Sequence, residues 1–225
     1  MMNVRKAQLY INGTWVEEPR AAEPVKNPYT GEVIGEQQLA TPDDVERALA
    51  SAFAAKKDIA RIPAYERARI LKKASMLLEE RKEMFARYIS EELGKPLKNT
   101  LDEVSRSIET LEQSAEEAKR LFGETIPGDA SARGVKAVAV TFRVPVGVVA
   151  AITPFNAPLN LICHKVGPAF AAGNTVVLKP APQTPLIAAE LLKLLLEAGL
   201  PPRAINMVLG GAEKAGEKVH PEAGI

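Results

Sequence analysis

Short apolar segments alternate with helical patterns in the last part of the chain, and this alternation limits the possible folds more than any other feature. The apolar segments are residues 146–152, 175–179 and 205–209, and the helical patterns cover about 159–172 and 185–198. Strands that alternate with helices through short loops form a parallel sheet covered by helices. We therefore predict a doubly wound α/β fold in which 146–152 is a fully buried strand and a further helix opens near Glu213.

The first part of the chain is predicted to add a β-hairpin and a layer of helices. Asn12-Gly13 between two short apolar runs is a strong hairpin signal. Thr41 followed by Pro42 marks the N-terminus of a first helix. A second helix runs from about Ile70 to Ile89, and Gly94 is its expected C-cap.

A third helix carries apolar residues at spacings of three and four: Leu101, Val104, Ile108, Leu111, Ala115, Ala118 and Phe122. Such a stripe can form an intermolecular coiled coil, but one of this length more often packs inside a globular helical layer, which we favour.

Residues 135–145 alternate apolar and polar side chains, as in a half-exposed strand. We expect three parts: 1–134 with the hairpin and helices, 135–145 as a bridging strand for oligomer formation, and 146–225 as the cofactor-binding half.

Composition excludes several classes of partner. Twenty-nine Lys and Arg stand against 28 Asp and Glu among 225 residues, so no basic field exists to attract nucleic acid or an anionic membrane. One cysteine and two histidines do not provide a zinc site, and we expect no metal. The absence of a signal peptide and of a long apolar run predicts a cytoplasmic protein.

Several catalytic motifs are absent or incomplete. The chain contains no G-x-G-x-x-G and no G-x-S-x-G, and in the near P-loop 211–218 Glu217 stands where a lysine would meet phosphate. Cys163 could be a nucleophile beside His164, but its helical neighbours are apolar, so we interpret it as a core thiol.

The segment Ile152-Thr153-Pro154-Phe155-Asn156-Ala157-Pro158 follows the first strand of the predicted sheet. Its two prolines fix the backbone, so the Asn156 amide is held in place. A fixed N–H donor can stabilise negative charge that develops on a carbonyl oxygen. The alternative is a turn asparagine that caps the next helix, which the spacing alone favours.

Two further strand ends carry candidate binding residues. Lys179 ends the second strand, and the loop after it, with Pro182, has no acidic side chain to bond a ribose 2′-hydroxyl, which favours tolerance of a 2′-phosphate and use of NADP as well as NAD. The alternative is a surface lysine. Gly210 and Gly211 close the third strand, and Ala215 with Gly216 follows; small residues allow close approach of a ligand, although a glycine after a strand can be only a turn.

Together these segments resemble the aldehyde dehydrogenase superfamily. The similarity rests on "ITPFNAPLN", "PAFAAGNTVVLKPAPQTPL", "AGLPPRAINMVLG", "ELGKP" and "YINGTWV" with "NPYTGEVIGE", which occur in the family's order. The resemblance implies a Rossmann-like cofactor domain that binds NAD or NADP, and a homo-oligomer that oxidises a small-molecule aldehyde to a carboxylic acid.

The resemblance also implies roles for individual residues. Asn156 would donate to the oxyanion formed when a thiolate attacks the aldehyde. The residues that would contact the cofactor are Ile152, Thr153, Pro154, Phe155, Lys179, Gly210, Ala215 and Gly216. Pro182 stands where many NAD-preferring members have a glutamate.

The family's nucleophilic cysteine, general-base glutamate and Gly-Ser turn would lie beyond Ile225, and Cys163 does not align with the nucleophile. We therefore expect the N-terminal portion of such an enzyme, inactive alone. Two alternatives are a non-catalytic protein that binds nucleotide or a subunit, and a dehydrogenase that transfers the acyl group to coenzyme A.

Overall fold

A five-stranded sheet forms the centre of the protein. The computed structural model describes residues 5–211, in which this sheet has the strand order β3-β2-β10-β9-β8. β8 (Val148–Ile152), β9 (Thr175–Lys179) and β10 (Ile205–Met207) are parallel, and α5 (Pro158–Ala171) and α6 (Pro185–Ala198) connect them. The predicted doubly wound α/β fold is confirmed, and the helix predicted near Glu213 lies outside the described residues.

The predicted N-terminal hairpin is also confirmed, and it extends the parallel sheet. Asn12 and Gly13 have positive φ angles of 54° and 84°, as a two-residue turn with the twist of a hairpin requires. This turn joins β2 (Tyr10–Ile11) to β3 (Thr14–Trp15). Tyr10 lies opposite Met207, so β2 pairs antiparallel with β10.

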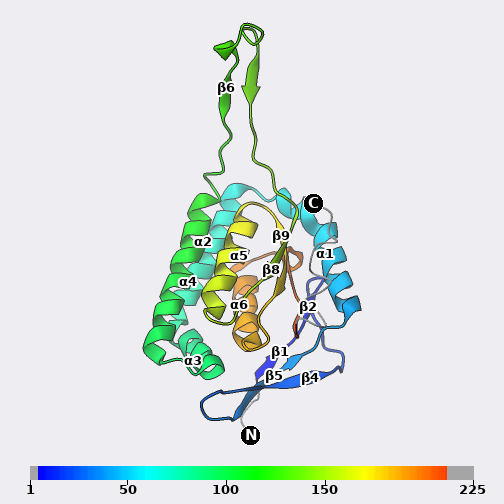
Figure 1. Cartoon of the computed structure of the whole chain (residues 1–225), viewed down its shortest axis with the longest axis vertical. Coiled ribbons are helices and arrows are strands. Elements are labelled where there is room, and N and C mark those ends of the chain that lie inside the picture. Colours follow the sequence, from blue (N-terminus) through cyan, green and yellow to red (C-terminus); the bar gives the residue numbers. More distant parts are fainter. Residues whose placement is uncertain (1–4, 212–225) are drawn as a thin grey trace.

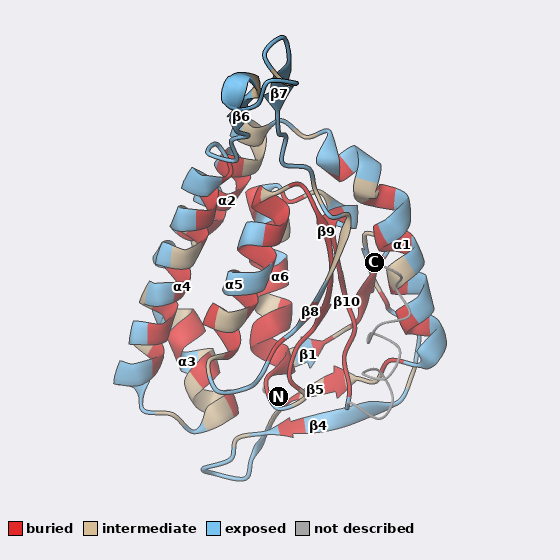
Figure 2. Ribbon diagram, turned by 45° about the horizontal axis from the view of Figure 1, so that its top comes forward, coloured by how far each residue is buried: buried red, intermediate tan, exposed pale blue. Residues whose placement is uncertain are grey.

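Helices cover the sheet in layers (Figure 1). α1 (Pro42–Ala60) packs on one face, and α5 and α6 pack on the other. α2 (Ala64–Glu80), α3 (Lys82–Leu93) and α4 (Leu97–Glu117) form an outer layer over α5 and α6. Figure 2 shows that the buried residues gather between these layers.

Local signals explain two of the helix ends. Thr41 accepts a hydrogen bond from the Asp44 N–H at 3.3 Å, while the Asp44 carboxylate accepts one from the Thr41 N–H at 2.8 Å, so α1 begins with a capping box. Gly94 ends α3 with a φ of 66°, a left-handed conformation that glycine adopts without a Cβ clash. Both predicted caps are confirmed.

Two helix predictions are wrong. The second helix is not continuous, because it breaks at Arg81 (φ −108°, ψ 17°) between α2 and α3. The Arg81 guanidinium donates two hydrogen bonds to the Glu197 carboxylate on α6, a tertiary contact without a local signal. The apolar stripe of α4 ends at buried Ala118, whereas Phe122 is exposed where the chain leaves the helical layer.

A second sheet of three strands was not predicted. It contains β1 (Arg5–Ala7), β5 (Val33–Gln38) and β4 (Ala22–Lys26) in that order. The described residues also contain two short 3-10 helices, η1 (Gly128–Ala130) and η2 (Pro202–Ala204).

A narrow arm projects from the body (Figure 1). It consists of β6 (Thr125–Pro127), η1 and β7 (Val138–Val140), and β6 pairs antiparallel with β7. The predicted half-exposed strand over 135–145 is therefore wrong in extent and in burial, because β7 has three residues and all of them are exposed. The expected division at 1–134, 135–145 and 146–225 remains a prediction.

The prediction that 146–152 is a fully buried strand is also wrong. Only Ala151 of β8 is buried, and Ile152 is 41% exposed. The physical reason is the position of β8, which pairs with β9 along one edge and has no partner along the other edge within residues 5–211.

None of the helices within residues 5–211 combines the length and the apolar character needed to cross a membrane.

Candidate functional site

The carboxyl ends of β8 and β9 bring two predicted site segments together. Ile152 lies opposite Lys179 in the parallel register, and the Thr153 N–H donates to the Lys179 carbonyl oxygen at 3.2 Å. The turn that carries Asn156 and the end of β9 therefore lie at the same edge of the sheet. This is the edge at which doubly wound sheets bind their ligands.

The turn after β8 presents most of its residues to solvent. Ile152, Pro154, Phe155 and Asn156 are exposed, whereas Thr153 is 5% exposed. The Thr153 hydroxyl is buried without a hydrogen-bond partner in the part of the chain that the structure describes. An unpartnered hydroxyl beside an exposed turn is available to a ligand.

Asn156 does not cap α5. The N-cap residue is Ala157, and no side chain of the N-cap makes a capping hydrogen bond. Instead, the Glu103 carboxylate of α4 accepts hydrogen bonds from the N–H groups of Leu159 at 3.0 Å and Asn160 at 3.5 Å. The capping interpretation of Asn156 is wrong, and the oxyanion interpretation stays a prediction.

Lys179 is not a surface lysine. The residue is 5% exposed, and burial lowers the pKa of its ammonium group. Within residues 5–211 its Nζ donates one long hydrogen bond, 3.5 Å, to the carbonyl oxygen of Pro180. A buried cation with so little compensation is expected to bind further acceptors when a ligand supplies them.

The loop between β9 and α6 is held by the protein backbone and by neighbouring side chains. The Pro182 carbonyl oxygen accepts a hydrogen bond from Gln37 Nε2 at 3.1 Å, and the Thr184 N–H donates to the Ala181 carbonyl oxygen at 3.0 Å. Residues 180–184 include no acidic side chain.

Thr184 is the N-cap residue of α6, but its hydroxyl makes no capping hydrogen bond. That hydroxyl is buried and has no partner among residues 5–211. The cap is Glu92 of α3, whose carboxylate accepts from the N–H groups of Leu186 at 2.7 Å and Ile187 at 2.9 Å. Burial raises the pKa of Glu92 to about 8, because desolvation outweighs these two N–H donors.

Two internal glutamates thus occupy the N-termini of the helices that follow β8 and β9. Glu103 is 1% exposed and Glu92 is 3% exposed. In many dinucleotide-binding folds the pyrophosphate binds at the first such helix N-terminus. Here a glutamate side chain fills each position, so neither helix N-terminus is open to a phosphate group.

Neither glutamate was predicted from the sequence, although a signal was present. Glu92 follows Phe85 and Ile89 at helical spacing, so it lies on the apolar stripe of α3. Glu103 is likewise next to Val104 on the buried side of α4. An acidic residue on an apolar stripe predicts a buried carboxylate with a specific partner.

Two further residues considered from the sequence, Gly210 and Cys163, lie within the described part of the chain. Gly210 follows β10, is buried and has a φ of 119°, which only glycine adopts readily. The next two candidates, Ala215 and Gly216, lie outside the described residues. Cys163 is fully buried, and burial raises the pKa of its thiol to about 12, which confirms the interpretation as a core thiol.

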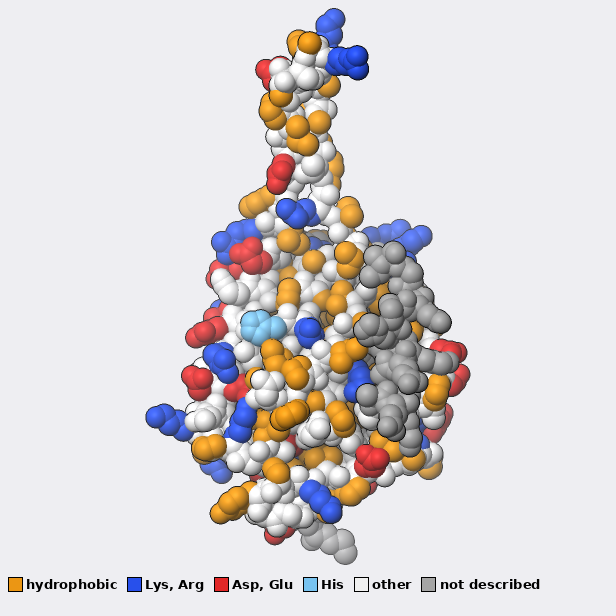
Figure 3. Space-filling view, in the orientation of Figure 1, with side chains coloured by type: hydrophobic (Ala, Val, Ile, Leu, Met, Phe, Trp, Pro, Cys, Tyr) orange, Lys and Arg blue, Asp and Glu red, His pale blue; other side chains and the backbone are white. Residues whose placement is uncertain are grey.

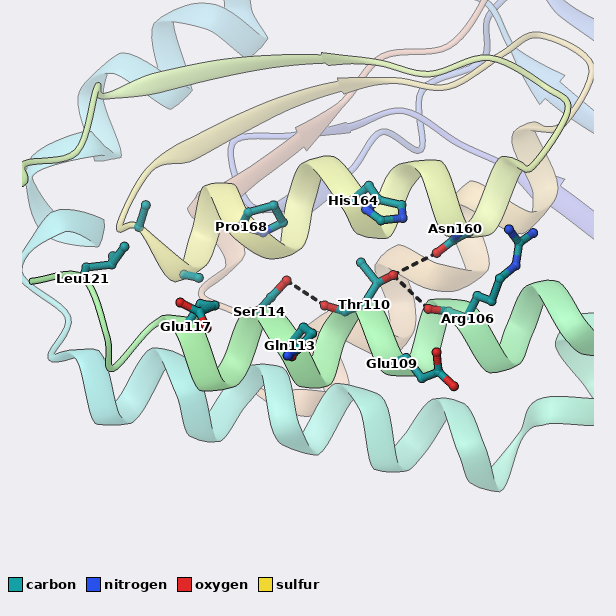
Figure 4. A pocket seen from close by; sticks show the side chains of 12 residues that line it. Arg106, Glu109, Thr110, Gln113, Ser114, Glu117, Leu121, Asn160, His164 and Pro168 are labelled. Atoms are coloured by element: carbon teal, nitrogen blue, oxygen red, sulfur yellow. Dashed lines mark hydrogen bonds between the residues drawn. The ribbon is translucent and has the colours of Figure 1, made fainter.

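A groove of about 500 Å³ runs between α4 and α5 (Figure 4). Gly167 allows the two helices to approach closely, since an added Cβ would lie 2.6 Å from Ser114 Oγ. Thr110 Oγ1 donates to Asn160 Oδ1 at 3.0 Å across the groove. The residues that line the groove are Arg106, Glu109, Thr110, Gln113, Ser114, Glu117, Leu121, Asn160, His164, Pro168, Ala171 and Ala172.

The charged groups of the groove are unevenly placed. In Figure 4, Arg106 extends toward the first turns of α5 near Asn160, whereas Glu117 lies toward the opposite end and Glu109 points away from α5. Arg106 also pairs with Asp102 on its own helix at 3.5 Å. Within residues 5–211 no group of three or more His, Cys, Asp or Glu side chains is arranged to hold a metal ion.

Comparison with known proteins identifies similar sequences and structures. A sequence model described as the aldehyde dehydrogenase family matches residues 15–225. A 3-sulfolactaldehyde dehydrogenase from Priestia aryabhattai is 46% identical over 96% of this chain and 45% of its own length. The mitochondrial succinate-semialdehyde dehydrogenase of Arabidopsis thaliana is 40% identical over 94% of this chain and 40% of its own length.

Solved structures agree with these sequences. An NADP-dependent glyceraldehyde-3-phosphate dehydrogenase from Bacillus halodurans C-125, solved with NADP, superposes with a TM-score of 0.92 and is 37% identical. The match covers 96% of this chain and 46% of that one. The chain therefore spans less than half the length of the relatives that it matches.

Proposed function

Because the chain belongs to the aldehyde dehydrogenase family, we propose that it supplies the oxyanion donor and part of the cofactor site for NAD(P)-dependent oxidation of an aldehyde to a carboxylic acid. One observation carries this proposal. The exposed turn with Asn156 and the buried Lys179 lie at adjacent strand ends of one parallel sheet. The relatives and their cofactors provide the reaction class.

Asn156 is proposed to donate a hydrogen bond to the oxyanion that forms when a thiolate adds to the aldehyde carbonyl. Its side chain is exposed, and it makes no hydrogen bond within residues 5–211 that would divert it. The nucleophile is not Cys163, since a buried thiol with a pKa of about 12 carries almost no thiolate near pH 7. We expect the polypeptide 1–225 to oxidise no aldehyde by itself.

The residues at the strand ends fit a dinucleotide. Within residues 5–211 the Lys179 ammonium makes one long hydrogen bond, so it can donate further to ribose hydroxyls or a 2′-phosphate, and the Thr153 hydroxyl has no partner there. Ile152, Pro154 and Phe155 provide exposed apolar surface beside them, and Gly210 allows close approach. When bound, the nicotinamide ring would accept a hydride from the substrate carbon.

We propose an aldehyde with an acidic group as the substrate class. The names of several relatives specify acidic aldehydes: 3-sulfolactaldehyde and the semialdehydes of succinate, aspartate and malonate. The groove between α4 and α5 begins one helical turn after the Asn156 turn, and Arg106 extends toward that end. A guanidinium there can pair with a carboxylate or sulfonate.

The arm is proposed to join copies of the chain into a homo-oligomer. A two-stranded ribbon is marginally stable alone, yet this one exposes Val138, Val140 and Phe142, which are 87%, 51% and 81% exposed. Figure 3 shows hydrophobic side chains along the length of the arm.

A cytoplasmic location is also proposed, since the single thiol needs no oxidising compartment. Cell fractionation tests this location.

Replacement of Asn156 tests the proposed activity. In the protein as its source makes it, Asn156→Ala is expected to lower kcat roughly 100-fold or more, because removal of one oxyanion donor costs about that factor. The affinity for NAD(P) should not change. Steady-state kinetics and calorimetric titration of the cofactor measure the two quantities. The control is Asn99→Ala, an exposed asparagine on α4; a kcat within twofold of wild type for Asn156→Ala contradicts the proposal.

The substrate class is tested with two aldehydes of similar length. We expect a higher kcat/KM for succinate semialdehyde than for butanal, and Arg106→Met should reduce that preference roughly tenfold through loss of one charge-assisted contact. Arg87→Met, an exposed arginine on α3, should leave it intact. Equal kcat/KM values for both aldehydes in wild type argue against an acidic substrate.

Pro182→Glu tests cofactor tolerance. Wild type is expected to bind both NAD and NADP, since no carboxylate faces the ribose from residues 180–184. A glutamate at position 182 should weaken NADP relative to NAD roughly tenfold, through repulsion of the 2′-phosphate. Gln183→Glu places the same charge one residue later and should have a smaller effect. Unchanged relative affinities in calorimetry count against this placement of the ribose.

Sedimentation velocity tests the arm. The protein as its source makes it should sediment as two or more copies, and Val138→Asp should shift it toward monomers because a charge would be buried in the contact. Ala132→Asp introduces the same charge in the exposed segment between β6 and β7 and should not. A wild-type monomer at micromolar concentration excludes the proposed role of the arm.

A further inference from the structure

We propose that Lys95, together with the buried Glu103, is a positioning residue that fixes the backbone of Asn156. The inference rests on the proposed function only for its catalytic consequence. The contact itself joins the turn between α3 and α4 to the turn after β8, two segments about 60 residues apart in sequence.

The turn between α3 and α4 holds the Lys95 backbone at both sides. The Gly94 N–H donates to the Ser90 carbonyl oxygen at 2.8 Å, and the Ser90 hydroxyl donates to the Lys95 carbonyl oxygen at 2.6 Å. Pro96 follows and fixes the next φ angle. The lysine side chain therefore starts from a well-defined place, and less conformational entropy is lost when it makes a contact.

The Lys95 ammonium makes two contacts. It donates to the main-chain carbonyl oxygen of Asn156, and it lies 3.4 Å from Glu103 Oε2. The Lys95 side chain is 32% exposed, whereas that of Glu103 is 2% exposed. Solvent therefore reaches the lysine and not the carboxylate, and it screens their attraction only in part. The positive charge thus compensates a buried carboxylate and bonds the residue that carries the proposed oxyanion donor.

Other contacts hold only the ends of the Asn156 turn. The Thr153 N–H is bonded to Lys179 at the start, and the Leu161 N–H is bonded to Ala157 where α5 begins. Between them, the Asn156 carbonyl is the group that Lys95 holds, with no second hydrogen bond to it within residues 5–211. Removal of the ammonium would release the middle of the turn.

Glu103 extends the same support to the next helix. Its Oε1 accepts from the Leu159 N–H at 3.0 Å, so one carboxylate holds both Lys95 and the first turn of α5. The two residues after Asn156 lead directly into that turn. Lys95 and Glu103 therefore fix the Asn156 backbone from two directions.

Accurate placement decides how much an oxyanion donor contributes. A displacement of about 1 Å at a reacting group can cost on the order of 100-fold in rate. The polar contacts of the Lys95 ammonium within residues 5–211 are with a main-chain carbonyl oxygen and a carboxylate. We therefore assign it a positioning role and not a catalytic one.

The test compares Lys95→Met, Lys95→Arg and Lys98→Met. Methionine keeps the length of the chain but removes the donor and the charge, arginine retains both, and Lys98 is an exposed lysine of α4 three residues away. The first readout is amide hydrogen exchange of Leu159, Asn160 and Leu161, the hydrogen-bonded N–H groups that directly follow the turn. The second is steady-state kinetics with succinate semialdehyde in the protein as its source makes it.

We expect Lys95→Met to accelerate exchange at these three amides at least tenfold and to lower kcat at least tenfold, with the KM for NAD(P) within twofold of wild type. Lys95→Arg should keep the exchange rate and kcat close to their wild-type values, and Lys98→Met should change neither quantity. Faster exchange spread over the whole chain in Lys95→Met would show a general loss of stability and would overturn the positioning role.

The two proposals fail in different ways. Unchanged exchange in Lys95→Met overturns the positioning role, whatever the activity of the protein is. Faster exchange with unchanged kcat, in a protein whose Asn156→Ala variant loses activity, also overturns it. If Asn156→Ala retains activity, the proposed function of Asn156 fails, and local exchange alone decides whether Lys95 holds the turn.

Discussion

Two buried carboxylates connect the outer helical layer to the sheet, and the geometry of the candidate site depends on them. Glu103 of α4 binds the first N–H groups of α5, and Glu92 of α3 binds those of α6. The first N–H groups of a helix have no acceptor within that helix, so each glutamate satisfies donors that would otherwise be unpaired. Each glutamate thus determines where a helix begins after a parallel strand.

These carboxylates also restrict how the sheet can bind a ligand. The N-termini of α5 and α6 are the places where a backbone would otherwise receive a phosphate. With Glu103 and Glu92 there, the groups that residues 5–211 still offer at this edge include the Asn156 turn, the Lys179 ammonium and the Thr153 hydroxyl. Such a set suits a ribose and a carbonyl oxygen better than a pyrophosphate.

The sequence predicted best those features that local chemistry decides. The Asn12-Gly13 turn, the capping box at Thr41 and the left-handed Gly94 each depend on a few adjacent residues, and each is present. The strand at 175–179 and the helix at 185–198 also have the predicted limits, since β-branched residues, prolines and glycine mark their ends. The shared edge of Asn156 and Lys179 followed from the parallel topology.

The features that were not predicted depend on contacts between distant segments. The break at Arg81 coincides with its hydrogen bonds to Glu197, and the cap of α6 comes from Glu92 instead of the adjacent Thr184. Burial of Lys179 and exposure of β8 likewise depend on what packs beside them. Propensity and periodicity describe one segment of the sequence at a time. They can therefore identify candidate site residues, but they do not identify the side chains from distant segments that hold those residues in place.

A comparison of the two capped helices shows why this matters for function. At α6 the glutamate bonds only the helix, whereas at α5 the glutamate also pairs with Lys95, which bonds the turn that precedes the helix. The added lysine is therefore not needed to begin a helix. In the proposed mechanism it serves the turn before the helix, where Asn156 has to present its side chain in one orientation.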